Sequence, residues 1–236
     1  MRELKFEQGS AGWLECRTGR ITASRISDVL ATLKRGGESA QRRNYRRELI
    51  AERLSGRSEN HYVSPEMEHG IECEPIARAA YEVGCDVMVD EVGFVLHPTM
   101  DFAGGSPDGL VGDDGLIEIK CGKTTTHLDW MAEGVVPEDH QAQIMWNLAC
   151  TGRKWADFIS FDPRLPEGLR IFIVRMDRDE ERIAAMEEEV MRFNLEIEEA
   201  IAKLSGRIVH KPAPPVDTRT PEQQCEAMAD AMEMVP

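Results

Sequence analysis

The sequence lacks a long apolar run, because charged residues interrupt its longest hydrophobic stretches within a few positions. Its first ten residues, MRELKFEQGS, contain no hydrophobic segment of the kind found in signal peptides. We therefore expect no membrane span, no signal peptide and a cytoplasmic location. The six cysteines form no CxxC pair, which argues against a zinc ribbon or a disulfide scaffold and predicts reduced, mostly buried thiols.

Length and composition predict one domain. With 236 residues, of which 42% are hydrophobic, the chain can bury one sizeable core. We assign residues 1–206 to this domain, with a helical part at about 1–84, a sheet-bearing core at about 85–177 and a long helix at about 178–205. Residues 207–236 are rich in proline and then in methionine, and we expect this tail to become ordered only against a partner.

The charge is unevenly distributed along the chain. The net charge of -15 counts against a nucleic-acid partner, since Lys and Arg supply most of the non-specific affinity for phosphates. However, acidic residues crowd positions 177–199, whereas positions 17–57 are strongly basic. We therefore expect a polarised molecule whose basic third can hold a polyanion.

Hydrophobic periodicity predicts five helices. They cover residues 21–33, 40–54, 65–83, 137–152 and 178–204. Thr22 or Ser24 would cap the first helix, and Pro75 would kink or split the third. Pro137 opens the fourth helix and Gly152 ends it.

Segments with alternating or β-branched residues predict the strands. They cover residues 86–98, 115–121, 155–162 and 169–177, and turn residues fill positions 101–111. Helices followed by a compact group of strands with one helix among them predict an α/β domain with a mixed central β-sheet flanked by helices.

One predicted strand carries an acid and a lysine. Glu118 and Lys120 lie two residues apart, so their side chains emerge on one face of the sheet. Ile117, Ile119 and Cys121 point to the other face.

Asp108 follows a proline in a Gly-flanked turn, from which its carboxylate can reach toward Glu118. Two converging carboxylates repel each other unless a hard cation lies between them, and oxygen ligands suit Mg²⁺ or Mn²⁺. Lys120 beside the metal would orient or deprotonate a water, or stabilise charge on a phosphorus, which predicts phosphodiester hydrolysis. The alternative is an exposed strand with an ordinary Glu–Lys pair, and this short pattern alone leaves both open.

The surrounding motifs resemble a known family. Asp followed by Glu-x-Lys resembles the signature of the PD-(D/E)xK nuclease superfamily, and SPDGL with GLIEIKC is similar to its lambda-phage exonuclease, or YqaJ-like viral recombinase, branch. Four further segments occur in the family's order, at residues 7–31, 69–78, 140–152 and 161–164. The resemblance covers residues 7–205 and implies the restriction-endonuclease-like core of that superfamily.

The resemblance implies a set of catalytic residues. Asp108 and Glu118 would bind metal together with the backbone carbonyl of Ile119, and Lys120 would be the catalytic lysine. Glu74 would help to bind a second metal or to position its water.

The resemblance also implies roles for five residues outside this set. Gln143 would reach back toward the active site, although it is otherwise read as a surface amide. Arg17, Ser24 and Ser106 would grip a terminal 5′-phosphate, whereas alone Arg17 would be a solvated cation and Ser24 a helix cap. Met67 would be an apolar wedge that splits the terminal base pair, with a core methionine as the alternative.

Two positions depart from the family's pattern. Gly122 stands where relatives often have proline, and Met145 replaces the second glutamine of a QxQ pattern. These changes would affect loop stiffness or one substrate contact.

The activity that the resemblance implies is a processive 5′-to-3′ exonuclease on linear double-stranded DNA. It would release 5′-mononucleotides and leave 3′ single-stranded overhangs for phage-type recombination. The implied cofactor is Mg²⁺, replaceable by Mn²⁺, with two ions per active site. The implied assembly is a homotrimeric ring that works with a single-strand annealing protein of the same phage or prophage in a bacterial cytoplasm.

Three other protein classes share parts of this pattern. A relative with an iron–sulfur cluster needs a clustered set of thiolates near the C-terminus, and only Cys225 lies there. A restriction-type endonuclease would cut closed circles. A non-enzymatic DNA-end-binding module is disfavoured by intact Asp108, Glu118 and Lys120.

Overall fold

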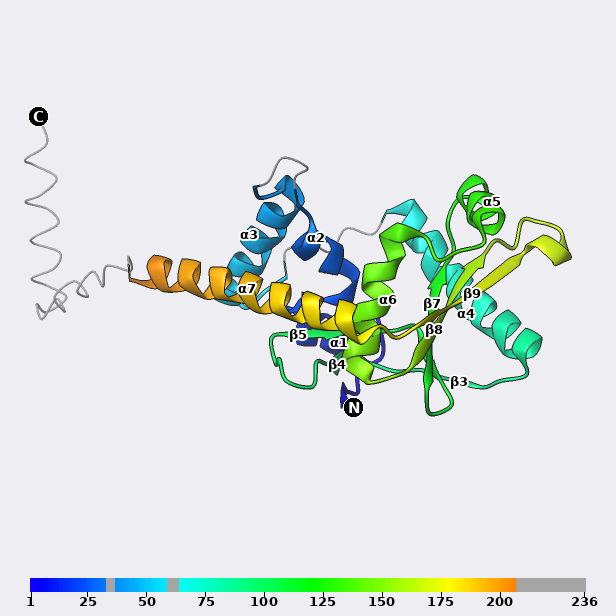
Figure 1. Ribbon diagram of the computed structural model, residues 1–236, viewed down its shortest axis with the longest axis horizontal. Coiled ribbons are helices and arrows are strands. Elements are labelled where there is room, and N and C mark those ends of the chain that lie inside the picture. The colour runs from blue at the N-terminus through cyan, green and yellow to red at the C-terminus, as the bar shows by residue number, and fades with distance from the viewer. Residues whose placement is uncertain (33–36, 59–63, 207–236) are drawn as a thin grey trace, which may run out of the picture. The chain divides into compact units, whose positions relative to one another are not determined.

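The computed structural model describes residues 1–32, 37–58 and 64–206 (Figure 1). Residues 1–202 form one compact unit, and the finer boundaries drawn from the sequence stay predictions. The tail expected at 207–236 lies outside the described residues. Within them, no helix combines the length and the apolar character that a membrane crossing requires.

The cysteines of the described residues are free thiols, as predicted. Cys16, Cys73 and Cys150 are buried, whereas Cys85 is exposed. Cys225 lies outside the described residues.

Four of the predicted helices are confirmed. They are α3 (Ala40–Ser55), α4 (Pro65–Cys85), α6 (Glu138–Thr151) and α7 (Glu180–Ser205). Ser39 and Ser64 cap α3 and α4 by accepting hydrogen bonds from first-turn amides, and Gly152 ends α6 in the left-handed conformation. α4 is not split at Pro75, contrary to one of the two expectations. Ile71 and Pro75 are both exposed, so water can satisfy the Ile71 carbonyl that proline leaves without a donor.

The helix predicted at 21–33 is largely wrong. Its described residues form β2 (Ile21–Thr22), the 3₁₀ helix η1 (Ala23–Arg25) and the short α2 (Ile26–Leu30), whereas residue 33 lies outside the described residues. Thr22 pairs in a sheet and donates its N–H to the buried Tyr45 hydroxyl at 3.1 Å, so tertiary contacts override the helical periodicity. Two helices, α1 (Ala11–Arg17) and α5 (Thr124–Glu133), were not predicted.

Two mixed sheets lie at the centre of the unit. The larger has the order β3-β6-β7-β8-β9, formed by β3 (Val89–Asp90), β6 (Gly109–Val111), β7 (Gly115–Lys120), β8 (Trp155–Phe161) and β9 (Ile171–Asp177). Only its β7–β8 pair is parallel. The smaller has the order β1-β4-β5-β2, with β1 (Arg2–Leu4), β4 (Phe94–Leu96) and β5 (Ala103–Gly105). The mixed α/β architecture is confirmed, but the second sheet was not predicted, and residues 101–111 supply a strand to each sheet instead of turns alone.

Helices cover both faces of the larger sheet (Figure 1). On one face, Ala77 and Tyr81 of α4 pack against Ile117 and Ile119 of β7. On the other, α6 packs against a separate apolar layer that includes Leu116 of β7. β7 is therefore buried between α4 and α6, and its residues alternate between the two layers.

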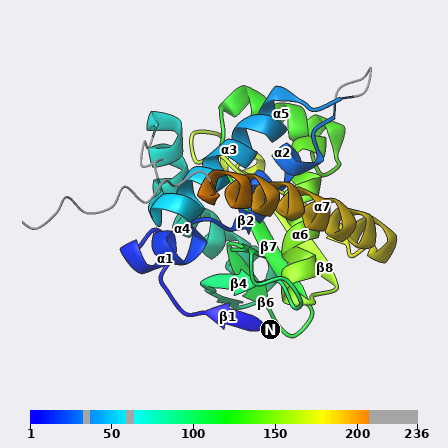
Figure 2. The same ribbon diagram turned by 90° about the vertical axis from the view of Figure 1, so that its left-hand side faces the viewer.

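α7 packs against the N-terminal helices and α6 (Figure 2). Val190, Phe193 and Ile197 of α7 are fully buried, and the rings of Phe193 and Tyr45 lie 5.9 Å apart. This apolar stripe explains the helical periodicity of a segment whose other face is acidic.

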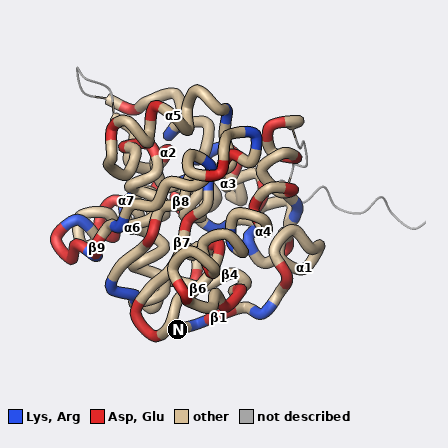
Figure 3. Tube along the Cα trace, turned by 90° about the vertical axis from the view of Figure 1, so that its right-hand side faces the viewer, with Lys and Arg blue, Asp and Glu red and all other residues tan. Residues whose placement is uncertain are grey.

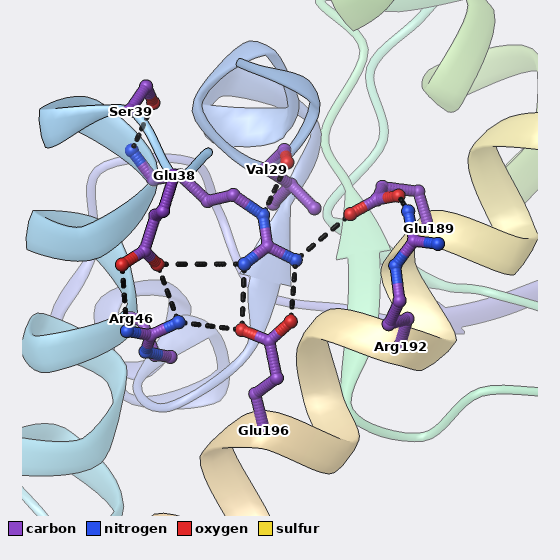
Figure 4. Close-up of polar contacts among 8 residues, drawn as sticks. Val29, Glu38, Ser39, Arg46, Glu189, Arg192 and Glu196 are labelled. Carbon is purple, nitrogen blue, oxygen red and sulfur yellow. Dashed lines mark hydrogen bonds and ion pairs between the residues drawn. The ribbon is translucent and has the colours of Figure 1, made fainter. Parts of the chain in front are cut away.

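An ion-pair network joins α3 to α7 (Figure 4). Arg42, whose side chain is 9% exposed, donates to Glu196 at 2.7 and 3.0 Å, to Glu189 at 2.9 Å and to the Val29 carbonyl at 3.2 Å. Arg46 also pairs with Glu196. The basic and acidic segments therefore neutralise each other in part, and Figure 3 shows Lys and Arg interspersed with Asp and Glu. The expected polarisation of the charge stays a prediction.

Candidate active site

The β6–β7 hairpin brings Asp108 to β7. Gly109 pairs with Ile117, and the Asp108 N–H donates to the Ile117 carbonyl at 3.1 Å. The Asp108 carboxylate in turn accepts the Ile119 N–H at 2.6 Å. Asp108 is thus fixed beside the residue that follows Glu118.

Glu118 and Lys120 lie on the α6 side of β7. The Lys120 ammonium donates to Oε1 of Glu118 at 2.5 Å, while Ile117 and Ile119 pack toward α4. This confirms the predicted alternation. It excludes the ordinary exposed Glu–Lys pair, because Glu118 is 0% exposed.

α6 supplies two amides to the same carboxylate. Gln143 donates to Oε1 of Glu118, as its predicted reach toward the site requires, and it is therefore not a free surface amide. Asn147, one helical turn later, donates to Oε2 at 3.1 Å. Sequence reasoning missed Asn147, although its i,i+4 spacing from Gln143 places both on one helix face.

Burial controls the titration of these groups. It raises the pKa of Glu118 to about 7 even though Lys120 opposes the shift, and it also raises the pKa of Asp108. Burial by itself would lower the pKa of Lys120, but Glu118 and Asp108 outweigh it and hold this pKa above its ordinary value. The lysine is therefore charged and is the partner that balances the buried acids.

Glu74 of α4 lies at the edge of this group. Burial, and next the charge of Asp108, raises the pKa of Glu74. Its carboxylate accepts from Arg78 at 2.7 Å, and Arg78 also pairs with Glu91. Glu74 is thus near the other acids but is held by Arg78, and its predicted role stays a prediction.

The donor set fits a hard cation that keeps several waters. In the part of the chain that the structure describes, no three His, Cys, Asp or Glu side chains form a metal-binding group. Mg²⁺ does not require one, since it binds through one or two carboxylates together with waters and substrate phosphates. Asp108 and Glu118 supply such oxygens. The Ile119 carbonyl as a further ligand stays a prediction.

A second cluster contains the three residues assigned to the 5′-phosphate. The guanidinium of Arg17 lies 4.0 Å from the ring centroid of Trp13 and donates to the Ser24 hydroxyl at 3.3 Å. The Trp13 indole N–H donates to the Ser106 hydroxyl at 3.1 Å. Ser24 caps no helix, and Arg17 is partly buried, with a pKa lowered by that burial. The structure therefore brings Arg17, Ser24 and Ser106 together through contacts with Trp13. The sequence analysis did not identify Trp13 as part of this cluster.

Two methionines lie in different environments. Met67 in the first turn of α4 is 54% exposed, so the core alternative is wrong, and the wedge role stays a prediction. Met145 is buried on α6 and its sulfur accepts the Asp179 N–H at 3.4 Å, away from the carboxylates.

A mixed sheet flanked by helices, with two acids and a lysine gathered on one strand and its neighbouring turn, defines the class of restriction-endonuclease-like folds. The chain belongs to the YqaJ-like viral recombinase family, whose model matches residues 12–154. No curated protein matches the chain.

Solved structures support the same assignment. The alkaline exonuclease LHK-Exo from Laribacter hongkongensis is 43% identical, covering 83% of this chain and 96% of that chain with a TM-score of 0.77. Its complex with dAMP gives a TM-score of 0.78 at the same identity and coverage. A phage-related exonuclease from Haemophilus somnus 129PT, 17% identical over 78% of this chain and 96% of that chain, has a TM-score of 0.65 and supports the fold alone.

Proposed function

We propose that this protein is a nuclease that acts on linear double-stranded DNA and digests the 5′-ended strand processively from its end. The observation that carries the proposal is that Asp108, Glu118 and Lys120 gather at one end of β7, with Glu118 buried, in a member of this family. The related LHK-Exo has been crystallised with dAMP, a deoxynucleoside monophosphate such as this reaction would release.

The residues of the site divide the chemistry between them. Asp108, Glu118 and the Ile119 carbonyl would hold Mg²⁺, or Mn²⁺ in its place, and Glu74 would contribute to a second ion. The bound metal would polarise the scissile phosphate and its attacking water. Lys120 orients that water or stabilises the negative charge that develops on the phosphate, and Gln143 keeps Glu118 in place.

The second cluster would recognise the DNA end. The guanidinium of Arg17 and the hydroxyls of Ser24 and Ser106 suit a terminal 5′-phosphate, because a guanidinium can donate two parallel hydrogen bonds to phosphate oxygens. The exposed Met67 would separate the terminal base pair. Hydrolysis would then release 5′-mononucleotides and leave a 3′ overhang.

The proposal extends to assembly. A homotrimeric ring would explain processivity without tight binding, because DNA threaded through a ring cannot leave between cuts. The overhang would serve a single-strand annealing protein of the same phage or prophage in a bacterial cytoplasm.

The test compares linear duplexes with 5′-phosphate and 5′-hydroxyl ends in the presence of Mg²⁺. We expect mononucleotide release from the phosphorylated duplex, none after chelation with EDTA and none from Lys120→Ala. Equal activity on closed circles would instead identify an endonuclease. Tight binding of ends without hydrolysis would identify a binding module.

A further inference from the structure

The nitrogen and the oxygen of the buried Asn147 side-chain amide lie in different environments. It is 0% exposed, and its Nδ2 donates to Oε2 of Glu118 at 3.1 Å. Its Oδ1 is buried and accepts no hydrogen bond. A buried polar atom without a hydrogen-bond partner lowers stability. A functional role of the hydrogen bond from Asn147 to Glu118 would explain why the chain keeps this amide.

The orientation of the amide follows from chemistry. An ionised carboxylate only accepts hydrogen bonds, so the NH₂ group of Asn147 must face Glu118 and the oxygen must turn away. The oxygen then lies against Gly105 of β5, where a Cβ atom would be only 2.2 Å from it. Glycine at position 105 is therefore what allows the amide to reach Glu118.

The two oxygens of Glu118 are held differently. Oε1 accepts from Lys120 and Gln143, both of which are partly exposed. Among the described residues, Oε2 accepts only from Asn147, which is fixed inside the core. Asn147 is thus the fully buried partner that restricts rotation of the carboxylate about its last bond.

We propose that Asn147 is a positioning residue that orients Glu118 for a divalent cation, with Gly105 as the position that makes room for it. This inference rests on the proposed function, because it assigns Glu118 as a metal ligand. Partners that orient a ligand typically contribute about 10- to 100-fold in metal affinity or activity.

The test measures Mn²⁺ binding by calorimetry in the absence of DNA. Asn147→Ala is compared with Asn194→Ala, a matched control on α7. Asn194 is also buried, also donates to a glutamate, Glu198, at 2.7 Å, and also has an unpartnered Oδ1. We expect Asn147→Ala to bind Mn²⁺ about 10-fold or more weakly and Asn194→Ala to bind it like the wild type, with similar losses of Tm in both.

Gly105→Ala tests the same role with a second variant, because it keeps the Asn147 amide but displaces it from Glu118. It should weaken Mn²⁺ binding in the same direction, and excess Mn²⁺ should restore nucleotide release in both site variants. Equal Mn²⁺ affinities in Asn147→Ala, Asn194→Ala and the wild type would overturn the inference. A wild-type protein that degrades no DNA would contradict the proposed function, whereas calorimetry would still decide the role of Asn147.

Discussion

The ammonium of Lys120 lies 2.5 Å from a carboxylate oxygen of Glu118, and the two side chains are 27% and 0% exposed. The lysine is therefore the charge that makes a buried glutamate tolerable at this position. Any cation that binds Glu118 must share the carboxylate with this ammonium or displace it.

Replacing Lys120 with methionine should separate binding from chemistry. Methionine keeps much of the volume but removes the competing ammonium, so Mn²⁺ affinity should not fall when it is measured well above the raised pKa of Glu118. Nucleotide release should drop by at least about 100-fold, the lower range for a residue that transfers or orients a proton. Lys154→Met is the control, since Lys154 is 71% exposed in a surface ion pair with Asp114. An active Lys120→Met protein would remove Lys120 from the mechanism.

Replacing Arg17 with glutamine should change the choice of DNA end. The variant loses the charged fork and its stacking on Trp13. The ratio of initial rates on 5′-phosphate and 5′-hydroxyl duplexes should fall by about 10- to 100-fold, the loss expected for a charged hydrogen-bond donor. Arg57→Gln, at an exposed position on the surface, should leave the ratio unchanged. An unchanged ratio in Arg17→Gln would place the 5′-phosphate elsewhere.

Acid should destabilise the protein through His140. Burial of its ring lowers the pKa of His140 to about 4, and the positive charge of Lys120 adds to the decrease. The unfolded chain binds this proton below its ordinary pKa of about 6.5, so the stability that the neutral ring contributes is lost as pH falls from about 6.5 to about 4.

His140→Phe keeps an aromatic ring against Phe158 and Trp130 but cannot bind the proton. Between pH 6.5 and 4, urea denaturation should show a loss of unfolding free energy on the order of 2 kcal/mol smaller in this variant than in the wild type. Parallel pH profiles of the two proteins would contradict the prediction.

In the ion-pair network between α3 and α7, the buried Arg42 should contribute more to stability than exposed arginines of α3 do. Arg42→Met leaves Glu189 and Glu196 without their buried partner and should lower the unfolding free energy by about 2–3 kcal/mol. Arg43→Met, at the next and exposed position of α3, should change it by less than about 0.5 kcal/mol. Urea denaturation at low and high salt measures both, and equal losses would show that Arg42 acts only as a surface charge.

Local signals predicted the parts of the fold that depend on local contacts. α6 begins after Pro137 and ends at Gly152 because those residues act within one turn of the chain. The alternation along β7 likewise follows from strand geometry, which is why Glu118 and Lys120 were placed on one face before any contact was known.

Local sequence patterns could not predict contacts between residues that are far apart in the sequence. The segment at 21–33 has helical periodicity, yet pairing with β5 and the hydroxyl of Tyr45 make part of it a strand. Trp13 meets Ser106 across 93 positions, and no spacing rule links them. The spacing of four residues from Gln143 could have placed Asn147 on the same helix face. Its partner Glu118 is 29 positions away, so no local pattern links the two.

The two-residue period of β7 also restricts how this family can change in length. Adding or deleting a single residue within Gly115–Lys120 would exchange the two sides of the strand, sending Ile119 toward the amides of α6 and Glu118 into the apolar layer under α4. Natural variation should therefore collect at the hairpin tip, at positions 112–114, where Gly112 already adopts a left-handed conformation with φ of 52°. Within the strand, only changes in even steps preserve the polarity of its faces.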